Sequence, residues 1–105
     1  MEYRVKLTDQ FLEEFDEMID YISSQLKNID ASNRLREKVT NNILLLENSP
    51  RMCTGIEKTD RTERQYRRMI VNNYVILYTI DELKKMVYIA HAYYGGKNYL
   101  DGGLL

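Results

Sequence analysis

The sequence predicts an α+β domain in which an αα-hairpin packs on one face of a roughly four-stranded antiparallel sheet. Three observations lead to this fold class. The chain begins with a short alternating strand, continues with two amphipathic helices joined by a short link, and ends with three β-rich segments separated by turns. The element order is therefore β-α-α-β-β-β. The 105-residue chain is expected to form a single domain over residues 1–105 with one core.

Residues 3–8 form the first expected strand, because apolar and polar side chains alternate there. The expected buried face carries three apolar side chains: Tyr3, Val5 and Leu7. Either Thr8 or Asp9 can cap the helix that follows. Apolar residues at helical spacing define the buried stripe of that helix: Phe11, Leu12, Phe15, Met18, Ile19, Ile22 and Leu26. Acidic side chains fill its other side, where they are expected to be solvated.

Asp30 is expected to cap a second helix, which ends before Pro50. Its apolar stripe consists of Leu35, Val39, Ile43 and Leu46. Because the link around residues 27–29 is short, the two helices are expected to be antiparallel neighbours. Residues 49–65 then form an irregular, charged connection that is longer than the usual loop.

Three further strands are expected at about residues 65–71, 74–80 and 86–94. Asn72-Asn73 predicts a tight turn between the first two, because Asn tolerates a positive φ. A longer hairpin loop over residues 81–85 separates the last two. The three strands are expected to form an antiparallel meander, with the helices on one face and the other face free.

Charge is divided unevenly along the chain, although the net charge is only −1. Residues 1–50 carry a net −4, whereas residues 51–105 carry a net +3 and most of the nine tyrosines. The basic half could meet phosphates or an acidic partner segment. The single Cys53 cannot form an internal disulfide, and no apolar run reaches the length of a membrane span. These features predict a cytoplasmic protein without a membrane partner.

Several segments, in this order and at this length, resemble the RelE/ParE superfamily of toxins from type II toxin–antitoxin (plasmid stabilisation) systems. They are Tyr3-Arg4-Val5-Lys6-Leu7-Thr8, Asp20-Tyr21-Ile22, Leu46 to Pro50, Tyr66-Arg67-Arg68, Val71-Asn72-Asn73-Tyr74, Tyr78-Thr79-Ile80-Asp81 and Tyr94-Gly95 with Tyr99. The resemblance implies a small toxin that inhibits growth when it is free of a co-expressed antitoxin. It also implies a toxin–antitoxin hetero-oligomer. We expect an antitoxin segment with acidic and apolar residues to wrap the helix hairpin and the basic sheet edge.

Two activities recur in this superfamily, and both stay open at this point. RelE-like members cut messenger RNA on the ribosome, whereas ParE-like members inhibit DNA gyrase by binding. A nuclease would need groups that remove a proton, bind the phosphate and return a proton. The candidate catalytic residues are Arg67, Arg68, His91, Tyr94, Lys97 and Tyr99. The two arginines alternate along one strand, so only one of them can face a given side. His91 is expected to share its face with Ile89 and Tyr93.

The end of the last strand departs from the superfamily pattern. Relatives often carry a basic pair and an acid there, where this chain has Gly96-Lys97-Asn98. The net charge also differs from the strongly basic character usual for proteins that contact ribosomal RNA. Both features favour a gyrase inhibitor over an endoribonuclease, with a non-toxic antitoxin-binding module as a further alternative. No phosphate loop or metal-ligand spacing occurs, so neither a metal nor a nucleotide cofactor is expected, and an enzyme would be a metal-independent nuclease.

Overall fold

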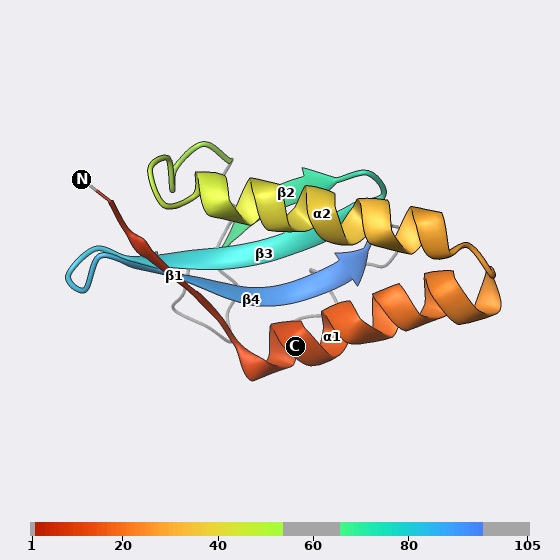
Figure 1. Cartoon of the computed structure of the whole chain (residues 1–105). Coiled ribbons are helices and arrows are strands. Elements are labelled where there is room, and N and C mark those ends of the chain that lie inside the picture. Colours follow the sequence, from red (N-terminus) through yellow and green to blue (C-terminus); the bar gives the residue numbers. More distant parts are fainter. Residues whose placement is uncertain (1, 54–65, 96–105) are drawn as a thin grey trace.

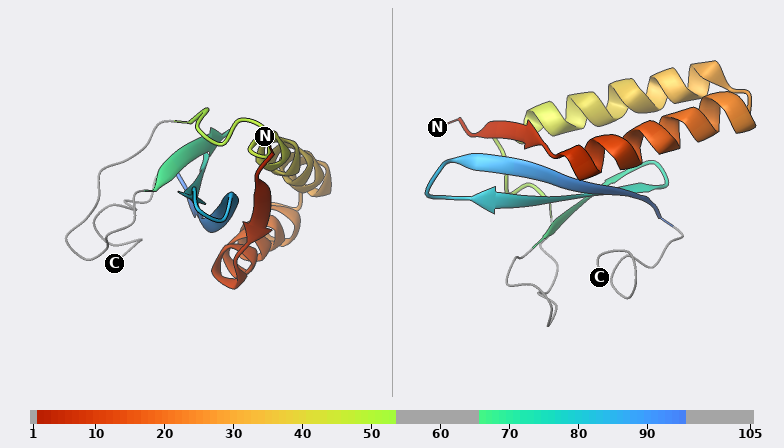
Figure 2. Two further views of the ribbon diagram at one scale, coloured as in Figure 1. Left: turned by 90° about the vertical axis from the view of Figure 1, so that its left-hand side faces the viewer. Right: turned by 90° about the horizontal axis from the view of Figure 1, so that it is seen from below.

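The computed structural model describes residues 2–53 and 66–95. Its elements are β1 (Arg4–Leu7), α1 (Asp9–Asp20), a π-helical turn η1 (Tyr21–Gln25), α2 (Ile29–Leu45), β2 (Arg67–Val71), β3 (Tyr74–Asp81) and β4 (Met86–Tyr94). This order confirms the predicted β-α-α-β-β-β arrangement. The two helices lie side by side over one face of a four-stranded sheet (Figures 1 and 2).

The sheet is mixed, so the expectation of an antiparallel sheet was wrong for one of its pairs. The strand order is β1-β4-β3-β2, and β1 pairs with β4 in parallel. The other two pairs are antiparallel, as expected of a meander. The helical hairpin returns the chain to the end of the sheet where β1 began, so β2 runs in the same direction as β1. Two further reversals then leave β4 parallel to β1.

One extra residue interrupts the pairing of β3 with β4. Tyr78 lies opposite Ile89, but its neighbour Leu77 lies opposite His91, so Ala90 is inserted between the two pairs as a β-bulge. Because of this insertion, Ile89 faces the helices whereas His91 faces the opposite side. The expectation that His91 shares a face with Ile89 was therefore wrong.

The helices cover one face of the sheet, which we call the covered face, and bury the main core there. Side chains of the two helices pack on Met69, Val71, Ile76, Tyr78, Val87, Ile89 and Ala92. The predicted stripe of α2 is buried in this core, as are four residues of the first helical segment: Phe11, Phe15, Ile19 and Ile22. Leu12 and Leu26 are exposed instead, because they lie at the sides of the stripe.

Three local expectations can be compared with the structure. Thr8 caps α1, since its side chain accepts a hydrogen bond from the Phe11 amide. The cap of α2 is Asn28 rather than the expected Asp30. The Asn28 side chain accepts a hydrogen bond from the Ala31 amide, and the helix begins at Ile29, directly after the cap. Leu7, expected to be buried, is 40% exposed, because it lies at the last position of an edge strand.

The opposite side of the sheet, which we call the far face, is not simply free. Val75, Leu77 and Tyr93 are buried there, and Tyr66 packs against them. Ile70 on the neighbouring edge strand is 64% exposed. Within the residues described, no helical segment combines the length and apolar character that a bilayer span requires.

Candidate functional site

The structure separates the two neighbouring arginines of β2. Arg67 lies opposite Tyr78, a residue of the covered face, and its Nη1 donates a hydrogen bond of 2.6 Å to the Cys53 carbonyl oxygen. Arg68 lies opposite Leu77 and therefore belongs to the far face. Only Arg68 is thus on the same side of the sheet as His91, with the strand β3 between them.

His91 lies among three side chains at the edge of the far face. Its Nδ1 is 3.3 Å from Oε1 of Glu14, which reaches across from α1. The Tyr93 ring stacks on the imidazole at a centroid distance of 5.6 Å, and Tyr66 meets it edge-on at 6.0 Å. With the proton on Nδ1, the imidazole donates to Glu14 and keeps Nε2 as an acceptor. This is the arrangement that orients a histidine for proton transfer.

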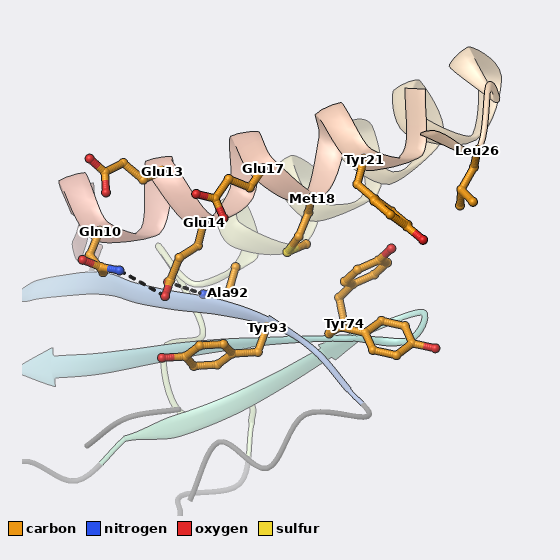
Figure 3. A pocket seen from close by; sticks show the side chains of 11 residues that line it. Gln10, Glu13, Glu14, Glu17, Met18, Tyr21, Leu26, Tyr74, Ala92 and Tyr93 are labelled. Atoms are coloured by element: carbon orange, nitrogen blue, oxygen red, sulfur yellow. Dashed lines mark hydrogen bonds between the residues drawn. The ribbon is translucent and has the colours of Figure 1, made fainter. Parts of the chain in front are cut away.

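Glu14 itself has a structural task beside its contact with His91. β1 ends opposite Ile89, so β4 has no strand neighbour on that side from Ala90 onward. Glu14 occupies this edge, where its Oε1 accepts a 3.0 Å hydrogen bond from the Ala92 amide (Figure 3). Gln10 donates to the other carboxylate oxygen at 3.2 Å. The carboxylate therefore replaces a missing strand and holds His91 at the same time.

Tyr93 is held neutral by its surroundings. Burial raises the pKa of its phenol to about 12, and the charge of Glu14 and the nearby Tyr66 act in the same direction. The hydroxyl lies 3.4 Å from Nδ1 of His91. A phenol with such a raised pKa is a weak proton donor at neutral pH.

Tyr94 projects to the side opposite His91. It lies across from Tyr74, and the two rings meet edge-on at a centroid distance of 5.7 Å. The pKa of Tyr74 is raised by burial and by its neighbours Tyr94 and Tyr21. Two further candidates, Lys97 and Tyr99, lie outside the described residues. The predicted catalytic residues that can be placed are thus divided between both faces of the sheet.

A groove of about 780 Å³ runs between α1 and the end of β4. We call it the acidic groove. The described residues that line it are Gln10, Glu13, Glu14, Glu17, Met18, Tyr21, Leu26, Tyr74, Ala92, Tyr93 and Tyr94. Glutamates of α1 lie at one end above Tyr93, and Tyr21, Tyr74 and Leu26 lie toward the other end (Figure 3). Sequence reasoning missed this site by treating the acids as solvated surface. The signal was present, since Gln10, Glu13, Glu17 and Tyr21 follow each other at helical spacing.

A smaller hollow of about 330 Å³ lies near the turn between β2 and β3. Its lining residues are Arg68, Ile70, Asn72, Asn73, Val75, Tyr94 and Gly95. Gly95 fits only without a side chain, because an added Cβ would lie 2.6 Å from the Asn73 carbonyl oxygen. Its amide donates to that oxygen, which fixes the end of β4 against the turn.

No group of three or more metal-ligating side chains occurs within residues 2–53 and 66–95. The contact between Glu14 and His91 is an acid–base arrangement that the geometry supplies.

Three solved structures with a similar fold are toxins or toxin–antitoxin complexes. A RelE–RelB complex from Pyrococcus horikoshii matches with a TM-score of 0.65 and 17% identity, covering 93% of this chain and 100% of that chain. The toxin–antitoxin complex RelBE2 from Mycobacterium tuberculosis matches with a TM-score of 0.57 and 16% identity, covering 90% of this chain and 99% of that chain. The isolated RelE toxin of E. coli matches with a TM-score of 0.60 and 12% identity, covering 97% of this chain and 94% of that chain. At such identities the likeness establishes the fold.

The family assignment rests on a separate comparison. A search among curated proteins found no match. Residues 5–98 match the sequence model of the family described as the ParE toxin of the type II toxin–antitoxin system parDE. That match spans nearly the whole chain, from β1 to beyond β4. The chain therefore belongs to the ParE toxin family of type II toxin–antitoxin systems.

Proposed function

We propose that this toxin inhibits DNA gyrase by binding to it. The observation that carries the proposal is the division of the candidate nuclease residues between the two faces of the sheet. RNA cleavage needs a proton acceptor, a phosphate-binding cation and a proton donor around one phosphate. A binding inhibitor needs only a complementary surface, and the ParE family match supports that reading.

The contacts of each candidate argue in the same direction. The guanidinium of Arg67 is engaged with the Cys53 carbonyl on the covered side. Tyr94 pairs with Tyr74 on that side as well. On the far face, the neighbour of His91 is Tyr93, whose raised pKa makes it a poor acid. Arg68 is left as the cation of β2 on the side of His91.

The test combines two readouts from one set of preparations. The purified chain is added to a gyrase supercoiling assay, and transcript 5′ ends are mapped after inducible expression without antitoxin. Inhibited supercoiling with intact transcripts is the expected result. Codon-spaced cuts with normal supercoiling would overturn the proposal. Normal growth with neither effect would leave a folded module that only binds its antitoxin.

The second candidate function is a ribosome-dependent endoribonuclease, and the contact between Glu14 and His91 favours it. A carboxylate that holds Nδ1 of a histidine leaves Nε2 to accept the proton of a 2′-hydroxyl. In that case His91→Ala would abolish the cuts. Glu14→Gln would reduce them and shift their pH profile, because the amide keeps the hydrogen bond but removes the charge. Unchanged cuts in His91→Ala would exclude this role.

An antitoxin is the partner that we propose with either activity. Two of the similar structures are complexes named for a RelE–RelB pair and for RelBE2. For this chain, the protein encoded by the adjoining reading frame is the expected antitoxin. Co-expression should restore growth, and the two proteins should copurify. A chain that remains equally toxic and does not copurify with that protein would contradict this assignment.

A further inference from the structure

We infer that the acidic groove receives an arginine- or lysine-bearing apolar segment of the antitoxin. The inference rests on the antitoxin partner proposed above and adds the chemistry of the part that is bound. It differs from the expectation that an antitoxin segment with acidic and apolar residues wraps both the helix hairpin and the basic sheet edge. The two halves of the chain carry opposite charge, so two parts of one partner would need opposite charge as well.

Among the described residues, the charge of the groove is not balanced from within. The lining residues within residues 2–53 and 66–95 include three glutamates and no Lys, Arg or His. Glu14 is already engaged with the Ala92 amide and with His91. Glu13 and Glu17 lie one helical turn apart and are exposed, and no ion pair in the described part of the chain includes them. These two carboxylates create a negative potential that favours a cation in the groove.

The other end of the groove suits apolar groups and the flat guanidinium of arginine. Tyr21 and Tyr94 are 56% and 57% exposed, and Tyr74 lies close to both of them. Exposed tyrosine rings bind apolar side chains and attract cations to their faces. Leu26 adds exposed apolar surface at the same end. A segment with apolar side chains beside the cation would therefore match both ends.

The length of the groove limits the size of the bound segment. Its lining extends along the helical segment from Gln10 to Leu26 (Figure 3), which corresponds to roughly 24 Å at the rise of an α-helix. About seven residues of extended peptide span that distance. One cationic side chain near Glu13 and Glu17, with apolar residues toward Tyr21, would occupy it.

The experiment measures the affinity of the chain for the purified product of the adjoining reading frame. The double variant Glu13→Lys/Glu17→Lys reverses the charge of the groove. The matched control is Asp16→Lys/Asp20→Lys, which makes the same change at the same spacing on α1, at exposed positions that do not line the groove. Reversal of two charges at an interface is expected to raise Kd about tenfold, and the control should stay near the original value.

A second variant tests the aromatic end independently of charge. Tyr21→Ser/Tyr94→Ser should also weaken binding, but with little dependence on salt, whereas the effect of the glutamate reversal should shrink as salt rises. Thermal unfolding checks that each variant is folded. Equal Kd values for the groove variant and its control would overturn the inference. Failure of the original chain to bind the antitoxin would instead remove the proposed partner, and the groove assignment with it.

Discussion

The acidic groove and the far face both draw on the end of β4, yet they differ in charge and in packing. In the part of the chain that the structure describes, the groove carries exposed tyrosines and two glutamates without an ion pair, Glu13 and Glu17, whereas the far face carries Arg68 and a histidine already enclosed by neighbours. Open, unpaired groups favour recognition of a partner, and enclosed groups favour stability or proton transfer. The longest strand of the sheet thus contributes side chains to two surfaces of different charge.

The largest expected effect is on the free energy of unfolding, which should respond differently to substitutions on the two faces of the sheet. Ile76 on the covered face is fully buried, whereas Ile70, one strand away on the far side, is 64% exposed. Ile76→Ala should lower the free energy of unfolding by about 2–5 kcal/mol, because it leaves a cavity in the core. Ile70→Ala should change it by less than about 0.5 kcal/mol. Urea denaturation measures both, and similar losses would contradict the assignment of the faces.

The next effect concerns the buried phenol beside His91. The pKa of Tyr93 is about 12 in the folded chain, whereas the unfolded chain should show the ordinary value of 10.0. The folded state therefore binds more protons between those values, and stability should fall as pH rises through that interval. In the Tyr93→Phe variant, the free energy of unfolding should therefore fall less over this pH interval than in the original chain, by up to about 2–3 kcal/mol. Urea denaturation from pH 8 to 12 measures it, and an unchanged slope would show that Tyr93 is not the group responsible.

A smaller effect tests the carboxylate that joins α1 to the β4 edge. Glu14→Ala leaves the buried Ala92 amide without its acceptor and should cost about 1–3 kcal/mol. Glu14→Gln retains an acceptor and should cost less than half of that. Hydrogen exchange at the Ala92 amide should accelerate in the alanine variant. Equal stability of both variants would mean that the carboxylate does not support the edge.

The smallest stability effect separates the two arginines. Arg67→Ala removes the hydrogen bond to the Cys53 carbonyl and should lower the free energy of unfolding by about 1 kcal/mol. If the far face contacts the target, Arg68→Ala should weaken toxicity in a chain that still unfolds in one cooperative transition. Growth after induction and thermal unfolding measure the pair. Full toxicity in Arg68→Ala and in the double variant would remove both arginines from the functional surface.

Much of the fold followed from patterns that act over short distances. Helical spacing located the buried stripe of α2, and Thr8 was one of the two expected caps of α1. The direction of β1 could not be deduced in the same way, since it depends on which sheet edge the first strand occupies. That choice is made by tertiary packing, and local propensity does not encode it.

The candidate site was harder to predict because its contacts are long-range. Glu14 and His91 are far apart in the sequence, and only the docking of α1 beside the free edge of β4 brings them together. The spacing of Arg67 and Arg68 did show that they must face opposite sides, but not which faces which. The acidic groove needed the positions of both layers, which no single helix pattern contains.

The inserted Ala90 has a consequence for how these surfaces could change. Before it, the odd-numbered side chains of β4 face the helices, and after it the even-numbered ones do. The insertion therefore shifts the alternation of side chains between the two faces by one residue. If Ala90 were instead paired in the regular ladder, without the bulge, this slip of one residue would send the imidazole toward the helices and Tyr94 away from them. A change of pairing register at this position would thus re-assign both surfaces without altering a single side chain on them.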